Sequence, residues 1–278
     1  MTAGPARAAG VVDCHVHVLD PARFPYAPDT FYPPAGQEIG TLAALRRTHD
    51  AHGVGHALLV GSNSGYGEDN TCLLAALAAD PHRYRGMAVV PLTTGRAELA
   101  ALRAAGVVGV TLNAALFGVA HYAGAGPLLR HLAALDMIAD VQVEGDQLPA
   151  LAPLLDASGV RVLVDHCGRP DPAAGTAAPG FAELLRRGRG GRWVVKLSGF
   201  VKFAAHPHPY PDAWPFVRAL VDAFGPDRCV WGSDWPFLRA PERIDYGPLL
   251  GLVDELLPEP SDRIRILWDT PRRELGFG

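Results

Sequence analysis

The sequence is short of the features that mark several classes of protein. It has no run of basic residues, no interleaving of aromatic and basic residues and no acidic tail, and its formal net charge is −4. Nucleic acid is therefore not expected as a partner. No apolar run is long enough to cross a bilayer, and residues 1–10 contain no apolar segment of the signal-peptide kind. We expect a cytoplasmic protein that does not bind a membrane.

Cysteine is also scarce, with four residues that lie far apart in the chain. Their spacing does not match a metal site, so we expect reduced and buried thiols, as in cytosolic proteins. Internal repeats are missing, and no change of composition marks a linker. We therefore expect a single domain over residues 1–278, in which residues 1–10 are flexible.

Short apolar runs alternate along the chain with amphipathic segments rich in Ala and Leu. The strand-like runs cover residues 11–20, 54–60, 86–90, 107–112, 138–143, 160–164, 193–197 and 229–231. The helix-like segments cover residues 42–52, 70–79, 97–105, 128–136, 148–157, 181–187 and 214–224, and further helices are expected at 248–257 and 262–273. Such alternation indicates a parallel sheet. Eight units in a chain of this length favour an α/β protein with a closed (β/α)8, or TIM, barrel over an open doubly wound sheet.

The first strand carries two histidines, in the stretch VVDCHVHVLD at residues 11–20. Successive side chains of a strand point to opposite faces, so Asp13, His15 and His17 should share one face. Two imidazoles on one face of an apolar strand indicate a site that accepts a proton, a metal ion or a substrate oxygen. The alternative is a pair of core histidines, which costs free energy unless both find hydrogen-bond partners.

Reactive groups of a parallel barrel gather at the carboxyl ends of its strands. At these ends the other predicted strands place a series of polar residues: Ser62, Asn113, Gln142, Asp165, His166, Arg169, Lys196, Lys202 and Asp234. Three histidines and one acid thus converge from strands one, six and eight. An acid beside several imidazoles suits a general base or a metal ligand.

Each of these side chains also has a structural alternative. Asp234 could cap a following helix, His166 could be a hydrogen-bonded core histidine, and Lys202 could be a solvated surface lysine. Asp165 should point away from His166, which favours a salt bridge or a hydrogen bond over catalysis. Lys196 ends an apolar strand, where a charge is costly without a partner.

Four motifs follow one another in order over nearly the whole chain. They are DCHVH at 13–17, DHCGRP at 165–170, KLSG at 196–199 and WGSDWP at 231–236. A single His-x-His would be a weak signal, but this set resembles the amidohydrolase superfamily, of the amidohydrolase-2 type. More narrowly, it is similar to the branch that contains 2-pyrone-4,6-dicarboxylate hydrolase and sugar-acid lactonases.

The resemblance implies a distorted barrel with one site at the strand ends. It implies that Asp234 activates water and that His15, His17 and His166 surround the reacting carbonyl. Lys196 is typical of the branch, and Lys202 falls where the dicarboxylate hydrolase has an arginine that holds a substrate carboxylate. We expect a small-molecule substrate to be bound by a polar set of residues: Lys196, Lys202, Ser62, Asn113, Tyr122 and Arg169.

The chain departs from the family pattern at two strands. Strand four reads VTLNAALF, without the lysine that bridges a dinuclear metal site, and strand five offers Gln142 in place of the usual histidine. His15, His17 and Asp234 could still hold one Zn²⁺ or another divalent ion, since three protein ligands suffice for a catalytic zinc. We favour an enzyme that requires no cofactor, because the branch includes metal-independent members. Strand four also lacks the arginines of the dicarboxylate hydrolase, which argues against a dianionic pyrone substrate.

The sequence therefore predicts a lactonase, a carboxylic ester hydrolase that opens a lactone of a sugar acid or of an aromatic-degradation intermediate. Asp234 would take the proton from water while the histidines stabilise the developing oxyanion. The alternatives are a lactone isomerase or a zinc-dependent decarboxylase at the same site, and a barrel that only binds a metabolite. The pattern does not decide whether the chain forms a homo-oligomer.

Overall fold

The computed structural model describes residues 10–278 and contains one parallel sheet of eight strands in sequence order. The strands are β1 (Val11–Val16), β2 (Val54–Val60), β3 (Tyr84–Ala88), β4 (Val107–Asn113), β5 (Ile138–Gln142), β6 (Arg161–Val164), β7 (Trp193–Leu197) and β8 (Cys229–Trp231). A bridge between Val16 and Trp235 joins β1 to the segment after β8. The sheet is a nearly closed barrel, so the predicted (β/α)8 fold is confirmed. The expected flexibility at the start of the chain concerns residues 1–9, which lie outside the described residues.

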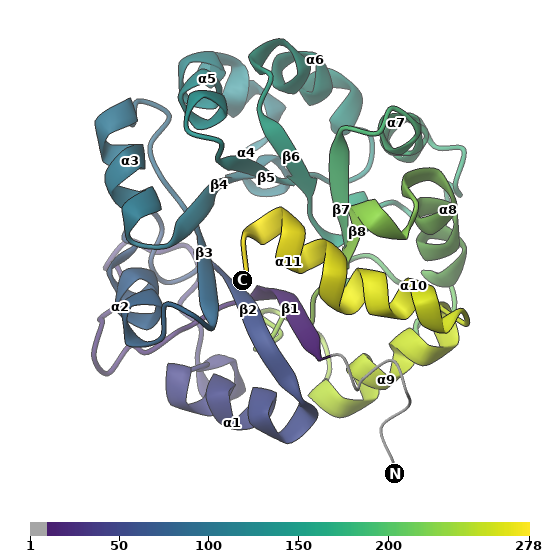
Figure 1. The fold of residues 1–278 in the computed structure, drawn as a ribbon, viewed down its shortest axis with the longest axis horizontal. Helices are drawn as coiled ribbons and strands as arrows, with labels where there is room; N and C mark the ends of the chain where they lie inside the picture. Colours follow the sequence, from purple (N-terminus) through teal and green to yellow (C-terminus); the bar gives the residue numbers. More distant parts are fainter. Residues whose placement is uncertain (1–9) are drawn as a thin grey trace.

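Most of the helices surround the barrel as an outer layer, whereas α11 lies across one end of it (Figure 1). The helices are α1 (Leu42–His52), α2 (Thr71–Ala79), α3 (Arg96–Ala104), α4 (Ala114–Phe117), α5 (Gly126–Ala134), α6 (Leu148–Ser158), α7 (Pro179–Arg189), α8 (Trp214–Phe224), α9 (Tyr246–Leu256), α10 (Pro260–Ile264) and α11 (Thr270–Leu275). The expected helix at 262–273 is interrupted by a π-helical turn, η7 (Arg265–Asp269). Within residues 10–278, no helix is both long and apolar enough to span a membrane.

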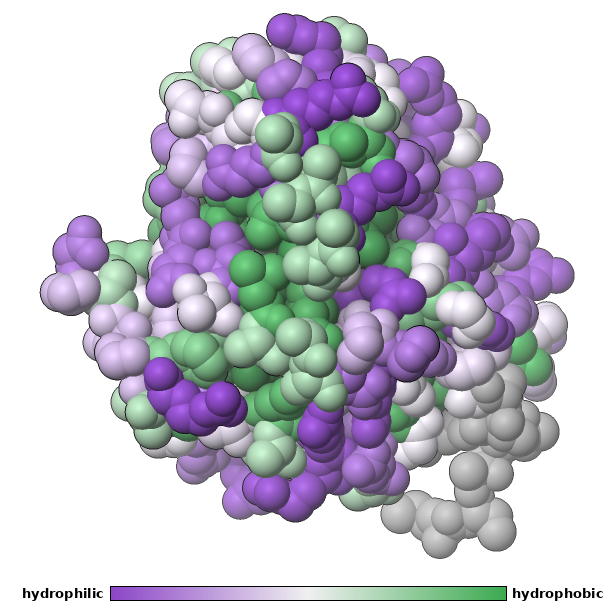
Figure 2. All heavy atoms as spheres, turned by 60° about the vertical axis from the view of Figure 1, so that its left-hand side comes forward, coloured by the Kyte–Doolittle hydropathy of each residue, from purple (hydrophilic) through white to green (hydrophobic). Residues whose placement is uncertain are grey.

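The surface on the side of α2 and α3 shows a strip of apolar side chains between polar ones (Figure 2). Leu74 and Ala75 of α2 are only partly buried. Cys72, Leu73, Ala76 and Leu77 are buried, whereas Ala78 and Ala79 at the end of the helix are exposed. This helix is therefore held by its apolar inner face, although its outer face is also poor in charge.

The C-terminal segment covers the end of the barrel at which the strands begin. The Arg85 guanidinium of β3 donates to the Gly276 carbonyl at 2.8 Å. The ring of Phe277 stacks on His56 of β2, with centroids 4.7 Å apart. In Figure 1, α11 accordingly lies across the barrel opening. The opposite end, where the strands finish, is left for a binding site.

The barrel interior has an apolar layer followed by a charged layer. The apolar layer is a buried cluster to which Ile138 and Leu163 belong and against which Val194 packs. Two residues further along the same segments, the inward positions carry charge and are fully buried: Asp140, Asp165 and Lys196. The charged layer lies directly beneath the carboxyl ends of the strands.

Strand β1 does not alternate regularly, because its pairing with β2 shifts register between Asp13 and Val16. Asp13 faces the outer helices, where the hydroxyl of Tyr246 donates to its carboxylate at 2.8 Å. His15 instead lies inside the barrel, with its Nδ1 atom 3.3 Å from Asp165. The prediction that Asp13 shares a face with the histidines is therefore wrong, since strict alternation holds only where a strand keeps its register.

Candidate active site

A lysine and two aspartates form a buried ion cluster inside the barrel. The Lys196 ammonium lies 2.9 Å from Asp140 Oδ1 and 2.7 Å from Asp165 Oδ1, and all three side chains are fully buried. Burial by itself would lower the pKa of Lys196, but the charges of Asp140 and Asp165 raise it above its usual value. Lys196 is therefore charged, and the salt bridge expected of Asp165 is confirmed.

The ion cluster holds the imidazole of His15 in place. Its Nδ1 atom lies 3.3 Å from Asp165 Oδ1 and 3.2 Å from the Lys196 ammonium. Burial lowers the pKa of His15, so the ring is neutral at physiological pH. Lys196 has no exposed surface. Its predicted contact with substrate does not fit this position, because the ammonium lies beneath His15 and acts on the site through that ring.

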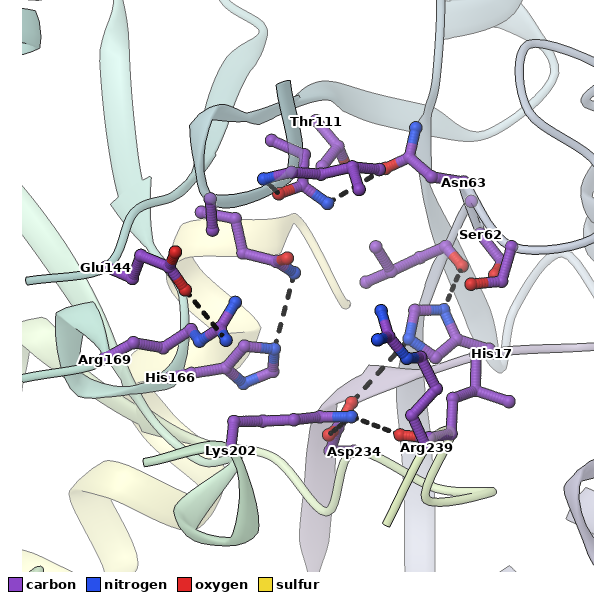
Figure 3. Close-up of a pocket in the computed structure, with 18 of the residues that line it drawn as sticks. His17, Ser62, Asn63, Thr111, Glu144, His166, Arg169, Lys202, Asp234 and Arg239 are labelled. Atoms are coloured by element: carbon purple, nitrogen blue, oxygen red, sulfur yellow. Dashed lines mark hydrogen bonds and ion pairs between the residues drawn. The ribbon is translucent and has the colours of Figure 1, made fainter. Parts of the chain in front are cut away.

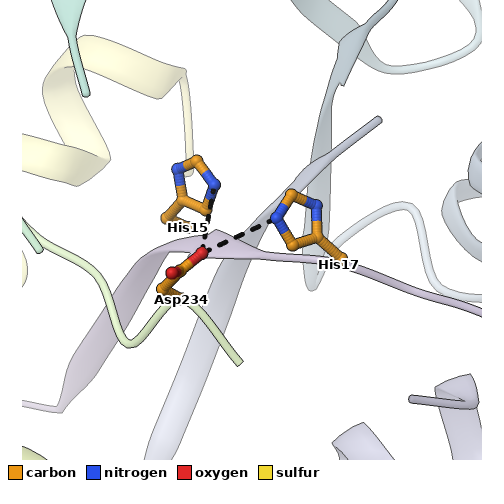
Figure 4. A group of neighbouring side chains, drawn as sticks. All are labelled: His15, His17 and Asp234. Atoms are coloured by element: carbon orange, nitrogen blue, oxygen red, sulfur yellow. Dashed lines mark ion pairs between the residues drawn. The ribbon is translucent and has the colours of Figure 1, made fainter. Parts of the chain in front are cut away.

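His15, His17 and Asp234 meet at the end of β1 (Figure 4). The Nε2 atoms of both imidazoles lie 3.7 Å from Asp234 Oδ1. The Nδ1 atom of His17 lies 2.8 Å from the Val60 carbonyl, so Nδ1 carries the proton and Nε2 keeps a free lone pair. Asp234 reaches this place because its backbone N–H donates to the His15 carbonyl at 2.8 Å. The loop after β8 is thereby fixed against β1.

His166 completes a group of three imidazoles. It follows β6, and its ring centroid lies 4.5 Å from that of His15. Its Nδ1 atom is 3.0 Å from Ser198 Oγ, and its Nε2 atom is 3.4 Å from Gln142 Nε2. Burial lowers the pKa of His166 to about 3, although the charge of Asp234 opposes this shift. His166 is therefore a neutral ring beside a carboxylate.

Asp234 is the carboxylate that faces these rings. Burial would raise its pKa, but the charge of Lys202 and the neighbouring His166 hold the pKa well below its usual range. The Lys202 ammonium lies 3.3 Å from Asp234 Oδ2 and donates to the Leu238 carbonyl at 2.5 Å. Lys202 comes from the short 3-10 turn η5 (Phe200–Lys202) after β7. Asp234 is thus ionised at neutral pH and ready to accept a proton.

A cavity of about 430 Å³ opens at the carboxyl ends of the strands (Figure 3). Its wall includes three of the four predicted catalytic residues and one lysine: His17, His166, Asp234 and Lys202. His15 lies beneath this wall. The sequence-based candidates from strands one, six, seven and eight are therefore brought to one place by closure of the barrel.

The predicted substrate-binding residues divide into two groups. Ser62, Asn113 and Arg169 line the cavity. Tyr122 does not, because its hydroxyl accepts a hydrogen bond from the Asn113 backbone N–H at 2.7 Å. Tyr122 thus positions Asn113 from behind, and its predicted contact with the substrate stays a prediction.

Asn63 and Thr111, at the ends of strands two and four, also line the cavity, but the sequence did not indicate Arg239 in its wall or Asp140 beneath it. Asp140 had a signal, since a charge within the apolar run IADVQ needs a buried partner. Arg239 had none, because it lies in the irregular loop after β8. Only the closed fold brings such residues to the cavity.

Two groups of side chains could hold a divalent ion. His15, His17 and Asp234 offer ligand atoms that all lie within 4.8 Å of one another, and so do His15, Asp165 and His166. The first group fits better, because His17 Nε2 keeps a free lone pair and His15 Nε2 has no hydrogen-bond partner in the described part of the chain. Asp165 of the second group is already engaged in its ion pair. The first donor set suits one ion such as Zn²⁺.

A (β/α)8 barrel with imidazoles and an aspartate at the carboxyl ends of its strands has the architecture of a barrel enzyme. The chain belongs to the amidohydrolase family, whose family model matches residues 12–277. The resemblance expected from the four motifs is confirmed.

Relatives with known names span nearly the whole chain. A 2-pyrone-4,6-dicarboxylate hydrolase of Comamonas testosteroni is 30% identical over 95% of this chain and 90% of its own length. A 4-sulfomuconolactone hydrolase of Rhizobium radiobacter is 31% identical over 96% of this chain and 90% of its own length. The crystal structure of a probable 2-pyrone-4,6-dicarboxylic acid hydrolase from Acinetobacter baumannii, with citric acid bound, superposes with a TM-score of 0.85 at 28% identity, covering 96% of this chain and 100% of that one.

Proposed function

We propose that the enzyme hydrolyses a lactone that carries a single acidic group, of the kind found among sugar acids and aromatic-degradation intermediates. The observation that carries this proposal is the ionised Asp234 at the wall of a polar cavity, beside neutral imidazoles and the Lys202 ammonium. The names of the relatives support it, since they describe hydrolases of a pyrone dicarboxylate and of a sulfonated muconolactone.

Asp234 is the general base of this reaction. It takes a proton from a water molecule, whose oxygen attacks the carbonyl carbon of the lactone. The free lone pair of His17 Nε2, 3.7 Å from Asp234 Oδ1, helps to orient the same water. The proton then passes from Asp234 to the ring oxygen as the carbon–oxygen bond breaks. The product is an open-chain hydroxy acid.

Lys202 stabilises the oxyanion that develops on the carbonyl oxygen. The Lys202 ammonium supplies a positive charge at the cavity wall. The Gln142 amide nitrogen approaches His166 Nε2 at 3.4 Å as a donor, so the proton of the neutral ring lies on Nδ1, which donates to Ser198 Oγ at 3.0 Å. His15 lies beneath Asp234, and its backbone carbonyl accepts the hydrogen bond from the Asp234 N–H at 2.8 Å.

We propose that no metal ion is required, because a lactone carbonyl is electrophilic and the chain itself supplies donors to the oxyanion. The position of Gln142, whose amide approaches His166 where a further histidine ligand would be needed, supports this. If a divalent ion binds, His15, His17 and Asp234 would hold it, and it would polarise the carbonyl and acidify a water molecule.

Two arginines face the cavity from opposite sides (Figure 3). The Arg169 guanidinium forms an ion pair with Glu144 at 3.0 Å. The Arg239 guanidinium forms no ion pair with any residue in 10–278, although it lies over the ring of Tyr32. The Arg239 guanidinium is thus free to pair with one substrate carboxylate. This suits a lactone with one negative charge better than one with two.

We place the reaction in the cytoplasm. All four cysteines are free and buried. Burial raises the pKa of Cys167 to about 12, so this thiol is unreactive even though it follows His166. Inert, reduced thiols suit a reducing compartment.

Proton release from a panel of sugar-acid and aromatic-pathway lactones tests the proposal, with a pH indicator and purified protein. Mass spectrometry of each product then separates the reactions, because hydrolysis adds water, isomerisation leaves the mass unchanged and decarboxylation removes carbon dioxide. We expect hydrolysis of a singly charged lactone at a rate that a chelator does not change. A product of unchanged or lower mass would reject hydrolysis, and a rate that is lost with chelator and restored by Zn²⁺ would reject metal independence.

A further inference from the structure

A second cavity, of about 470 Å³, lies beside the polar one at the ends of β3 and β4. Phe31, Asn63 and Thr111 line both cavities and therefore form the boundary between them. The Phe31 side chain is 54% exposed and comes from the irregular loop after β1. A ligand bound at Asp234 thus has a second enclosed space as its immediate neighbour.

The lining of the second cavity differs in character from that of the first. Val90 and Leu92, after β3, contribute aliphatic surface. Three rings form another wall: His121 stacks on Phe117 with centroids 5.0 Å apart and meets the edge of Tyr122 at 4.9 Å. Such a wall accepts a flat ring or an aliphatic chain.

The exposed apolar side chains and the charged residues around the second cavity also favour an apolar ligand group there. Within residues 10–278, the exposed large apolar side chains are Phe31, Leu116 and Phe117, and each lines one or both cavities. Apolar surface gathered at a cavity is costly in water unless a ligand covers it. The residues that line the second cavity include the acids Asp29 and Glu68 but no lysine or arginine, so an anionic group is disfavoured there.

We propose that the second cavity binds an apolar alkyl or aryl substituent of a lactone whose ring lies in the polar cavity. This inference rests on the proposed lactone hydrolysis and narrows its substrate class. Cavities for small ligands measure about 300–1,000 Å³, so the polar cavity alone accommodates a single ring. Binding of the remote substituent raises kcat/KM, and each methylene group moved from water into the cavity contributes about fourfold.

A series of lactones tests this, all with one ring carboxylate and with hydrogen, methyl, hexyl or phenyl on the carbon beside the ring oxygen. For the wild-type enzyme, we expect kcat/KM to rise at least tenfold from methyl to hexyl or phenyl. The matched variants are Thr93→Trp and Thr93→Ser, since Thr93 is exposed and lines the second cavity but not the first. Thr93→Trp should abolish the rise and leave the unsubstituted lactone unaffected, whereas Thr93→Ser should behave as wild type.

Calorimetry with the matching lactams, which resist hydrolysis, separates this inference from the proposed function. Tighter binding of the hexyl or phenyl lactam than of the unsubstituted one, lost in Thr93→Trp, supports the apolar subsite even if no lactone is turned over. Turnover of the unsubstituted lactone without any gain from a substituent leaves the proposed function intact and overturns the subsite. A gain that Thr93→Trp retains also overturns it, because the substituent then binds elsewhere.

Discussion

The protonation of Asp234 and His166 is set by the few side chains that surround them. Asp234 is buried, yet the charge of Lys202 keeps it ionised. His166 is also buried, and burial keeps its ring neutral. Two titratable groups whose pKa values are pushed apart in this way provide an ionised base and a neutral imidazole at the same pH. Both groups are therefore in the form that lactone hydrolysis needs at neutral pH.

Buried, neutral His166 should make the protein less stable in acid. In the unfolded chain a histidine takes up a proton near a pKa of about 6.5, whereas the folded pKa of His166 is about 3. Between these values the unfolded state binds more protons, so the free energy of unfolding falls with decreasing pH, by up to about 1.4 kcal/mol per pH unit from this group. Urea unfolding at about pH 7, 6 and 5 measures the slope. His166→Asn should have a shallower slope, and equal slopes in both proteins would contradict the assignment.

Strand β7 and the turn η5 give the two lysines of the chain opposite environments. Lys196 points into the barrel and is fully buried between Asp140 and Asp165, whereas the Lys202 side chain is 20% exposed at the cavity. The pattern of the strand correctly indicated that Lys196 needs a partner. It could not indicate Asp140 as that partner, because only closure of the barrel brings β5 and β7 together.

Replacement of each lysine by methionine should separate these two roles. Lys196→Met leaves Asp140 and Asp165 without their cation, which should lower the free energy of unfolding by about 3–5 kcal/mol. Lys202→Met should lower it less, because the Lys202 side chain is 20% exposed and its removal leaves one buried carboxylate rather than two without a cation. Lys202→Met should also raise the pKa of Asp234 and shift the acidic limb of the pH profile of kcat/KM upward. Urea unfolding and pH-dependent kinetics measure both effects, and a larger loss of stability in Lys202→Met would contradict them.

Across the whole molecule, the barrel is covered at one end by α11 and carries its candidate site at the other (Figure 1). The sequence predicted the barrel and a site at the carboxyl ends of its strands, because each β/α unit repeats a local pattern of apolar residues. That pattern predicted the strands and the outer helices. It also predicted which residues lie at the strand ends. These local signals also located Asp234, His17 and His166 correctly at the cavity.

The errors arose where the structure depends on contacts between distant segments. The register shift in β1 turned Asp13 outward, and η7 interrupted the expected last helix, although both segments look regular in sequence. The sequence also did not show that Tyr122 lies behind Asn113 and outside the polar cavity. Arg239 was missed because its position depends on how the loop after β8 folds back over the site.

The claim on which the proposed function depends is that Asp234 removes the proton from the attacking water. The most direct measurement is kcat of Asp234→Asn on the lactone that the panel identifies, with circular dichroism and urea unfolding to show that the variant is folded. An asparagine keeps the shape of the side chain but cannot accept the proton, so we expect kcat to fall by about 10²–10⁴-fold, the usual contribution of a general base. A folded Asp234→Asn enzyme with a near wild-type kcat would contradict the mechanism.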